Sequence, residues 1–418
     1  MRQRIPSLLA LLGLVLVPVP GLANDPFLLN DYALSLQAKG DYTKALEKLQ
    51  EAYRLYPYDE TLKKNLAETY TVIGNRQMEQ NRFDEAAETF DRARELYPEA
   101  ARYGTLRGIA LYHGKRYDAA LYEFERARGI AGDTPDVLYY LGKVRYDTGD
   151  LAGALEVWER ILERNPDNAK IRELADKVRR EQAVEARMEK GYSGKFTISY
   201  DAQVKSDLAD EILKALEDAY NRVGSDLSHY PTAKVPVLLY TKKDYRSITA
   251  GPDWSGGLYD GKIRLPIGGA EQLTPQLREV LFHEYTHVVV REITGGNCPT
   301  WLNEGLAELQ GRREVNRPLP ELGKALKNGG LLPMSTLEGP FMGLSAREAA
   351  LAYQQSYALV NFLVTQYGWH KVKEMLVALG SGLDTAAAVK RALGDYGLDY
   401  PAVIQEWRAY LQKEYGAS

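Results

Sequence analysis

Cysteine and histidine are both scarce in this sequence. Its 418 residues include one cysteine, which excludes an intramolecular disulfide and a cysteine-based zinc finger. Positive charge is not in excess: 53 Lys and Arg stand against 57 Asp and Glu, a net charge of −4, so sequence-independent nucleic-acid binding is not expected. The 45% hydrophobic and 26% charged residues are typical of a folded protein, and the length implies two or three domains. Chemistry that needs histidine must draw on five residues: His113, His229, His283, His287 and His370.

Long apolar runs are confined to the N-terminus. A basic start precedes an apolar stretch over 8–17, and small residues end the segment at Ala23. This order is typical of a secretory signal peptide. The alternative is a membrane anchor, but the stretch is shorter than the roughly 20 residues that span a bilayer, and Pro18 and Pro20 interrupt it. We therefore expect residues 1–23 to be a cleaved signal peptide, and the remainder to reach a bacterial periplasm or exterior without stable membrane insertion.

The first half of the chain repeats itself. Each of four segments has an aromatic residue or Leu, a small residue three positions on, a large apolar residue seven on, and a small or apolar residue ten on. These offsets place the side chains on one face of a helix. The last three segments begin 34 residues apart, and the first interval is seven residues longer, about two helical turns. The segments begin at Tyr42, Phe83, Tyr117 and Leu151.

A period of 34 with small residues at close-packing positions resembles the tetratricopeptide repeat. The resemblance covers about 26–168 and implies an all-α superhelix whose concave face binds a peptide or protein partner. A spacer that only carries the next domain is the alternative. A charged capping helix is expected over 168–190 and a linker over 191–194, so the repeat domain spans 24–190. The first helix of a pair is expected to stop at a glycine, namely Gly40, Gly114 or Gly149.

The second half begins with strands and continues as helices, which predicts an α+β domain. Short strands are expected over 195–200 and 235–240. Asp260-Gly261 is a hairpin signal between two more short strands. The second of these, 262–265, runs into Pro266, which cannot donate to a ladder and favours an edge position.

Two histidines stand one helical turn apart around a glutamate. Residues 283–287 read His-Glu-Tyr-Thr-His within a segment expected to be one continuous helix, so His283 and His287 project the same way. Two imidazoles so placed can hold one zinc ion, and Glu284 can take a proton from the water that zinc activates. Two structural histidines on a helix face are the alternative.

A third zinc ligand is expected from the next helix, which starts at about Thr300 and returns antiparallel toward His287. Glu304 lies early in that helix and is assigned as the ligand. Glu308, one turn on, is assigned to orient a histidine ring through its free N–H. The swapped assignment is the alternative. Cys298, in the turn between the helices, could be a fourth ligand or a redox-sensitive thiol, although a buried small residue is the simpler interpretation.

These residues look like those of the gluzincin metallopeptidases, the clan of thermolysin and aminopeptidase N. More closely, 195–415 resembles the peptidase MA-like domain of bacterial exported proteins, through HExxH, the block Trp-Leu-Asn-Glu-Gly-Leu-Ala-Glu at 301–308, and Tyr-Gln-Gln-Ser-Tyr at 353–357. The resemblance implies a thermolysin-like α+β domain over 191–418. It also implies that the first glutamate of the block binds zinc while the second lies behind the ligands.

The family also carries a tyrosine that hydrogen-bonds the oxyanion of the tetrahedral intermediate. Its place matches Tyr353; Tyr357 is the competing candidate, and packing of both within a helix is the alternative. Aminopeptidases of the clan carry Gly-x-Met-Glu-Asn before HExxH, and its glutamate binds the free amine of the substrate. Residues 256–261 read Gly-Gly-Leu-Tyr-Asp-Gly instead, which favours an endopeptidase. The strand over 262–265 could pair with an extended substrate.

The sequence therefore predicts an exported zinc metallopeptidase that hydrolyses peptide bonds in a peptide or protein substrate. The repeats would recruit that substrate or dock the enzyme to a protein partner. The alternative is a scaffold or adaptor of the cell envelope, in which the repeats carry the function and the peptidase-like domain is structural.

Overall fold

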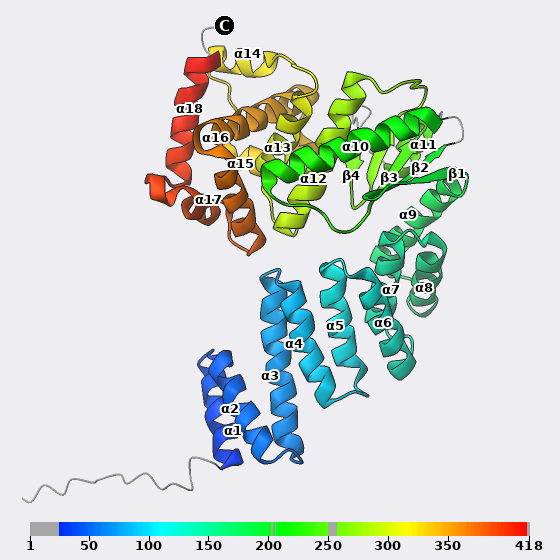
Figure 1. Ribbon diagram of the computed structural model, residues 1–418, viewed down its shortest axis with the longest axis vertical. Helices are drawn as coiled ribbons and strands as arrows, with labels where there is room; N and C mark the ends of the chain where they lie inside the picture. The colour runs from blue at the N-terminus through cyan, green and yellow to red at the C-terminus, as the bar shows by residue number, and fades with distance from the viewer. Residues whose placement is uncertain (1–24, 202–203, 205, 250–256, 416–418) are drawn as a thin grey trace, which may run out of the picture.

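The computed structural model describes residues 25–201, 204, 206–249 and 257–415. The expected signal peptide, residues 1–23, lies outside the described residues. Within those ranges, each helix is too short or too polar to span a bilayer. An array of helices comes first, and a domain of one sheet with many helices follows (Figure 1).

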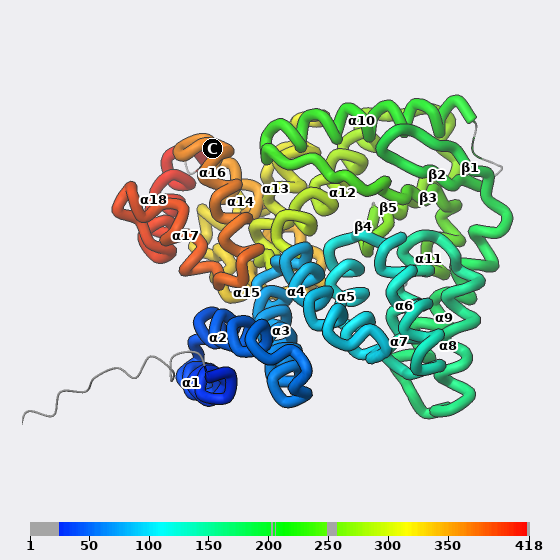
Figure 2. Tube along the Cα trace, turned by 60° about the horizontal axis from the view of Figure 1, so that its bottom comes forward, coloured from blue at the N-terminus to red at the C-terminus, as the bar shows by residue number. Residues whose placement is uncertain are grey.

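The array consists of antiparallel helix pairs stacked side by side (Figures 1 and 2). The second helix of each pair begins at the predicted residue. Each pair closes on itself through small buried side chains, because alanines let the helix axes approach. The pairs are α1 (Pro26–Ala38) with α2 (Tyr42–Leu55), α3 (Glu60–Glu79) with α4 (Phe83–Leu96), α5 (Ala101–His113) with α6 (Tyr117–Ala131), and α7 (Pro135–Asp147) with α8 (Leu151–Arg164).

In three pairs, a glycine of the first helix receives a buried aromatic ring of the second. These rings are at most 1% exposed. Any side chain on the glycine would meet the ring, so the glycine is what allows the large residue of the repeat pattern. A Cβ atom on Gly74 would lie 2.5 Å from Phe90, one on Gly108 2.7 Å from Phe124, and one on Gly142 2.1 Å from Trp158.

The turn within each pair uses a left-handed residue. Gly40 and Gly149 fill this position in the first and last pairs, with φ of +82° and +88°. In the middle pairs it is held by Asn81 and Lys115, with φ of +55° and +57°. Gly114 caps α5 with an ordinary φ of −75°, so the residue after it takes the left-handed conformation.

The sheet of the second half has the order β1-β2-β3-β5-β4. Its central pairs, β2–β3 and β3–β5, are parallel, and the outer pairs are antiparallel. One face packs on α10 and α12, and the other on α11 and the end of α9. The elements are α9 (Ala169–Glu185), β1 (Met188–Tyr192), β2 (Phe196–Asp201), α10 (Ser206–Leu227), β3 (Val235–Tyr240), α11 (Lys242–Thr249), β4 (Leu258–Tyr259) and β5 (Ile263–Pro266).

The remaining chain is helical and covers one end of this sheet (Figure 1). A non-helical Gly368 kinks the long helix α16. The helices are α12 (Pro275–Thr294), α13 (Thr300–Arg312), α14 (Pro320–Asn328), α15 (Met334–Glu338), η1 (Phe341–Gly343), α16 (Ala346–Gly380), α17 (Thr385–Leu393), η2 (Gly394–Tyr396) and α18 (Tyr400–Tyr415).

The predicted linker over 191–194 is wrong at its start. Gly191 and Tyr192 pair with Ile198 and Thr197 at the end of β1, and the predicted domain boundary after residue 190 falls inside this strand. The capping helix ends at Glu185 rather than at residue 190. Gly191 does not act as a hinge here. It makes room for the neighbouring strand, because a Cβ at this position would lie 2.8 Å from the side chain of Ile198.

The predicted edge position of the strand before Pro266 is also wrong. β5 lies between β3 and β4, with Pro266 as its last residue, paired with Tyr240, the last residue of β3. A proline at a strand end needs no ladder donor, so it is compatible with a central strand. Among the described strands, β4 lies outside β5 and pairs with Ile263 and Arg264, so a substrate strand added at this edge would meet β4 before these two residues.

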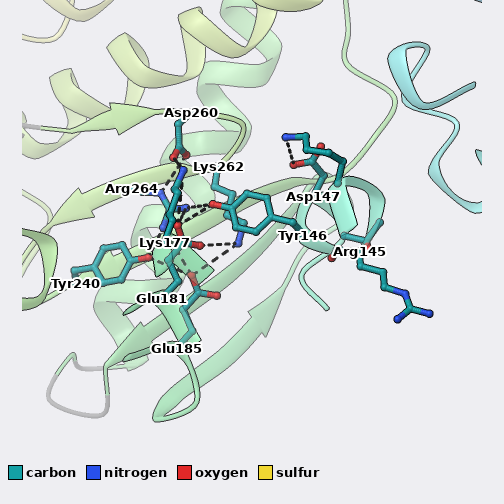
Figure 3. A network of polar contacts seen from close by, with 12 residues as sticks. Arg145, Tyr146, Asp147, Lys177, Glu181, Glu185, Tyr240, Asp260, Lys262 and Arg264 are labelled. Carbon is teal, nitrogen blue, oxygen red and sulfur yellow. Dashed lines mark hydrogen bonds and ion pairs between the residues drawn. The ribbon is translucent and has the colours of Figure 1, made fainter. Parts of the chain in front are cut away.

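A fully buried guanidinium joins the array to the sheet (Figure 3). Arg264 of β5 is 0% exposed. It donates to Asp260 at 3.1 Å, to Tyr240 at 2.6 Å, to Glu181 at 2.9 Å and to Tyr146 at 3.0 Å. Because Tyr146 lies on α7 and Glu181 on α9, these bonds connect the last part of the array to β3 and β5.

The glycine–aromatic contacts predict that one methyl group added at the glycine lowers the stability of the array. Gly142→Ala should lower the free energy of unfolding by about 1–3 kcal/mol, because the methyl overlaps the ring of Trp158. Thermal unfolding followed by circular dichroism measures the change. Gly129→Ala is the control: Gly129 is an exposed helical residue of α6 with open space around it. There, alanine should raise stability by up to about 1 kcal/mol. Equal effects of the two substitutions would contradict this packing.

The buried guanidinium should be far more costly to remove than an exposed one. Arg264→Ala leaves Glu181 buried without its main partner and should cost about 3–5 kcal/mol in urea unfolding. Arg179→Ala, on α9, removes two ion pairs of a residue that is 45% exposed. That control should cost less than about 1 kcal/mol. Similar midpoints for the two variants would show that the Arg264 network does not hold the halves together.

Candidate metal centre and active site

Helix α12 presents both histidines of the motif to one point. The helix starts where the Thr274 hydroxyl accepts the Leu277 N–H at 3.1 Å, and it ends at Gly295 with φ +63°. The ring centroids of His283 and His287 are 4.9 Å apart at an interplanar angle of 84°. The two imidazoles therefore converge from successive turns.

Glu304 completes this group from α13. Its Oε2 lies 3.5 Å from His283 Nε2 and 3.6 Å from His287 Nε2. The same oxygen is buried and has no hydrogen-bond partner among the described residues. The three possible ligand atoms lie within 4.8 Å of one another, and in the described part of the chain this is the group of His, Cys, Asp and Glu that could hold a metal ion.

The spacing and charge of this group fit a zinc ion. Two atoms each about 2.1 Å from a tetrahedral zinc lie about 3.4 Å apart, close to the two distances at Glu304. Desolvation opposes protonation of His283, but the nearby carboxylates of Glu304, Glu284 and Glu308 outweigh it and raise the pKa of His283 to about 9. Surroundings that favour a positive charge on His283 also favour a divalent cation. The orphaned oxygen of Glu304 would gain a partner from the same ion.

Side chains behind the ligands orient them. Glu308 Oε1 lies 3.6 Å from His283 Nδ1, and its other oxygen accepts from Arg312 Nε at 2.9 Å. On the other histidine, Nδ1 lies 3.0 Å from Asn303 Oδ1. Both contacts leave Nε2 facing Glu304. The roles of Asn303 and Arg312 were missed, although Arg312 is one helical turn beyond Glu308, and that spacing alone suggested an ion pair.

Glu284 lies beside the ligands and under the sheet edge. It is 5% exposed, and a Cβ on Gly257, the residue before β4, would lie 2.6 Å from its Oε1. The absence of a side chain at Gly257 is what lets the chain pass over this carboxylate. Desolvation raises the pKa of Glu284, while His283 and His287 oppose the rise. A carboxylate with a raised pKa is a better proton acceptor near neutral pH.

Tyr353 of α16 lies within electrostatic reach of Glu304, Glu308 and Glu284. Gly305 of α13 allows this placement: a Cβ there would lie 2.4 Å from the carbonyl oxygen of Ser356, so the two helices touch. Desolvation raises the pKa of Tyr353, and the charges of Glu304, Glu308 and Glu284 add to the rise. Tyr357 instead faces Arg312, whose guanidinium carbon lies 4.8 Å from the centre of the tyrosine ring.

Cys298 and the other three histidines lie outside the metal group. Desolvation and the charge of Glu304 raise the pKa of the Cys298 thiol, so it stays protonated near neutral pH. His113 stacks on Phe83 at the array turn. His229 lies 3.0 Å from Glu292 on α12.

Comparisons with known proteins agree with this division of the chain. Residues 217–413 match the Peptidase MA superfamily, and residues 26–99, 71–136 and 111–178 each match a tetratricopeptide repeat family. No curated protein matches the chain.

Several solved structures are similar to part of the chain. The crystal structure of MamA is 20% identical and covers 36% of this chain and 85% of its own, with a TM-score of 0.30. YrrB, described as a TPR protein with an unusual peptide-binding site, is 19% identical over 38% of this chain and 79% of its own, with a TM-score of 0.31. A tetratricopeptide repeat protein from Parabacteroides merdae is 14% identical over 79% and 98%, with a TM-score of 0.36. By its family matches, the chain carries an array of tetratricopeptide repeats followed by a peptidase MA superfamily domain.

Proposed function

We propose that this protein is an exported zinc metallopeptidase of thermolysin-like fold that cleaves peptide bonds within polypeptides. The observation that carries the proposal is the convergence of His283, His287 and Glu304 beside the buried carboxylate of Glu284, with the Glu304 oxygen lacking a hydrogen-bond partner among the described residues. These groups are the ligand set and the base that metal-assisted hydrolysis needs.

His283, His287 and Glu304 would hold the zinc ion through Nε2, Nε2 and a carboxylate oxygen. When bound, zinc supplies Lewis acidity to water and to the scissile carbonyl. Glu308 and Asn303 keep the imidazoles in the orientation that this requires.

Glu284 is the proton carrier of the proposed reaction. It accepts a proton from the attacking water and passes it to the leaving amine. Tyr353 donates its phenolic hydrogen toward the oxyanion. Its raised pKa supports this role, because the phenol keeps its proton at neutral pH.

Export and partner binding rest on other features. The N-terminal segment has the order of a signal peptide. The repeats belong to families whose stacked helices form extended protein-binding surfaces, which supports a role in recruiting substrate or docking a partner. The endopeptidase assignment rests on the Gly-Gly-Leu-Tyr-Asp-Gly segment at the sheet edge, which lacks the amine-binding glutamate of the aminopeptidases.

The proposal predicts separate losses of metal and of catalysis. Purified protein should hold one zinc per chain by elemental analysis and should cleave casein, an unfolded substrate, with a chelator abolishing cleavage. Glu284→Gln should keep the zinc and reduce cleavage by about 10²–10⁴-fold, because it removes the base and no ligand.

His287→Ala is the matched variant, because it removes a ligand and leaves the base in place. It should lose both zinc and cleavage. Full zinc content without cleavage of any unfolded protein would favour the adaptor function. Absence of stoichiometric zinc would refute the metal centre itself.

Removing one hydroxyl at a time distinguishes the roles of the two tyrosines of α16. Tyr353→Phe should lower kcat by about 10²–10³-fold with little change in KM and zinc content, because only the transition state uses this donor. Tyr357→Phe, one turn further along the same helix, should stay close to wild type. The reverse pattern in steady-state kinetics would assign the donor role to Tyr357.

A further inference from the structure

A cavity of about 520 Å³ lies between the array and the peptidase domain. Its size is that of an ordinary ligand pocket. Both parts of the chain form its walls. The array contributes Tyr112, Tyr117 and Lys143, and the peptidase domain contributes Lys234, Tyr259 and Arg291.

The sheet edge leads from the metal centre into this cavity. Gly257 lies over Glu284, and Tyr259, two residues on, lines the cavity together with Val288 of α12. Two strand residues advance about 6.6 Å and four helix residues about 6 Å, so the strand and α12 run side by side over this distance. An extended peptide laid along β4, the outermost described strand on this side of the sheet, would therefore run from Glu284 toward the cavity.

The acidic side chains of the cavity wall already have partners. Glu292 accepts from Lys115 at 2.6 Å and lies 3.0 Å from His229. Asp147 accepts from Tyr112 at 2.6 Å and lies 4.0 Å from Lys143. The other two acids of the wall are paired as well, Asp260 with Arg264 at 3.1 Å and Asp84 with Arg116 at 3.5 Å.

Two cations of the wall have no such partner. Arg291 and Lys234 are exposed and form no ion pair with any residue that the structure describes. Burial raises the pKa of Tyr117 and of Tyr259, and the Arg291 charge opposes the rise at both phenols. Arg291 thus acts between the array and the edge strand, and two of the four Lys and Arg side chains of the wall lack an ion pair with any described residue.

We propose that this cavity is a substrate subsite that binds acidic side chains of an extended polypeptide, a few residues to one side of the bond cleaved at the metal centre. Arg291 and Lys234 supply the attraction. Tyr117 and Lys143 make the array a wall of the subsite, so the repeats select the substrate as well as recruit it. The inference rests on the proposed peptidase function, which supplies the cleaved bond.

Cleavage-site profiling tests the subsite. The full chain, loaded with zinc, digests a peptide library made from a denatured bacterial proteome, and mass spectrometry identifies the cleaved bonds. Wild type should enrich Asp and Glu at about two to five residues on one side of the bond, from the rise of 3.3 Å per residue along the strand. The double variant Arg291→Glu/Lys234→Glu should lose this enrichment or replace it with Lys and Arg.

Lys413→Glu, an equally exposed charge reversal on α18, is the control and should keep the wild-type profile. Wild type without acidic enrichment, or a double variant with an unchanged profile, would overturn the subsite.

A binding measurement separates this failure from failure of the peptidase function. In the Glu284→Gln background, fluorescence anisotropy follows a labelled dodecapeptide with four glutamates at one end, and a matched peptide with glutamines. The acidic peptide should bind more tightly, and the double charge reversal should weaken it about tenfold, without affecting the glutamine peptide. Equal affinities before and after the reversal would refute the subsite even if the protein cleaves nothing.

Discussion

The buried guanidinium of Arg264 determines how the two parts of the chain lie against each other. A fully buried charge is tolerated only where partners surround it. Here Tyr146 and Glu181 come from the array, and Tyr240 and Asp260 from the peptidase domain. Neither part alone completes the set. Asp260 also directly follows the last residue of β4, so the network that joins the two parts also holds the sheet edge that passes the metal centre.

Two further contacts between the halves come from residues of the repeat turns whose backbone is strained. Asn81 and Lys115 adopt the left-handed conformation that Gly40 and Gly149 take in the other pairs. Such residues cost of order 1 kcal/mol or more relative to glycine. Their side chains reach the other half of the chain: Asn81 donates to the carbonyl of Gly380 at 2.5 Å, and Lys115 to Glu292 at 2.6 Å. Glycine would relieve the backbone and lose the contact. The turns of the middle repeats therefore serve docking as well as chain reversal.

Features that depend on local spacing could be predicted from the sequence, and features that depend on distant partners could not. The second repeat helices begin where the 34-residue pattern places them, because one helix face decides their packing. The His-Glu-x-x-His spacing put the two histidines on one helix face for the same reason, and the short turn to the next helix allowed Glu304 to be assigned beside them. β1 was missed since its strand character comes from pairing with β2 rather than from alternation. Asn303 and Gly257 were missed because their roles depend on His287 and Glu284, which only folding brings near them.

The array contacts the helix that carries both histidines of the metal group, in addition to the Arg264 network. A spacer needs one firm attachment, which the Arg264 network already provides. Yet Lys115 also bonds to Glu292, on the same helix as both histidines and about two and a half turns beyond His283. The same helix carries Arg291 into the cavity that the array closes. Movement of the middle repeats would therefore change the cavity and strain the end of α12. Under the proposed function, a partner bound to the repeats would act on the substrate path directly, without any separate signal between domains.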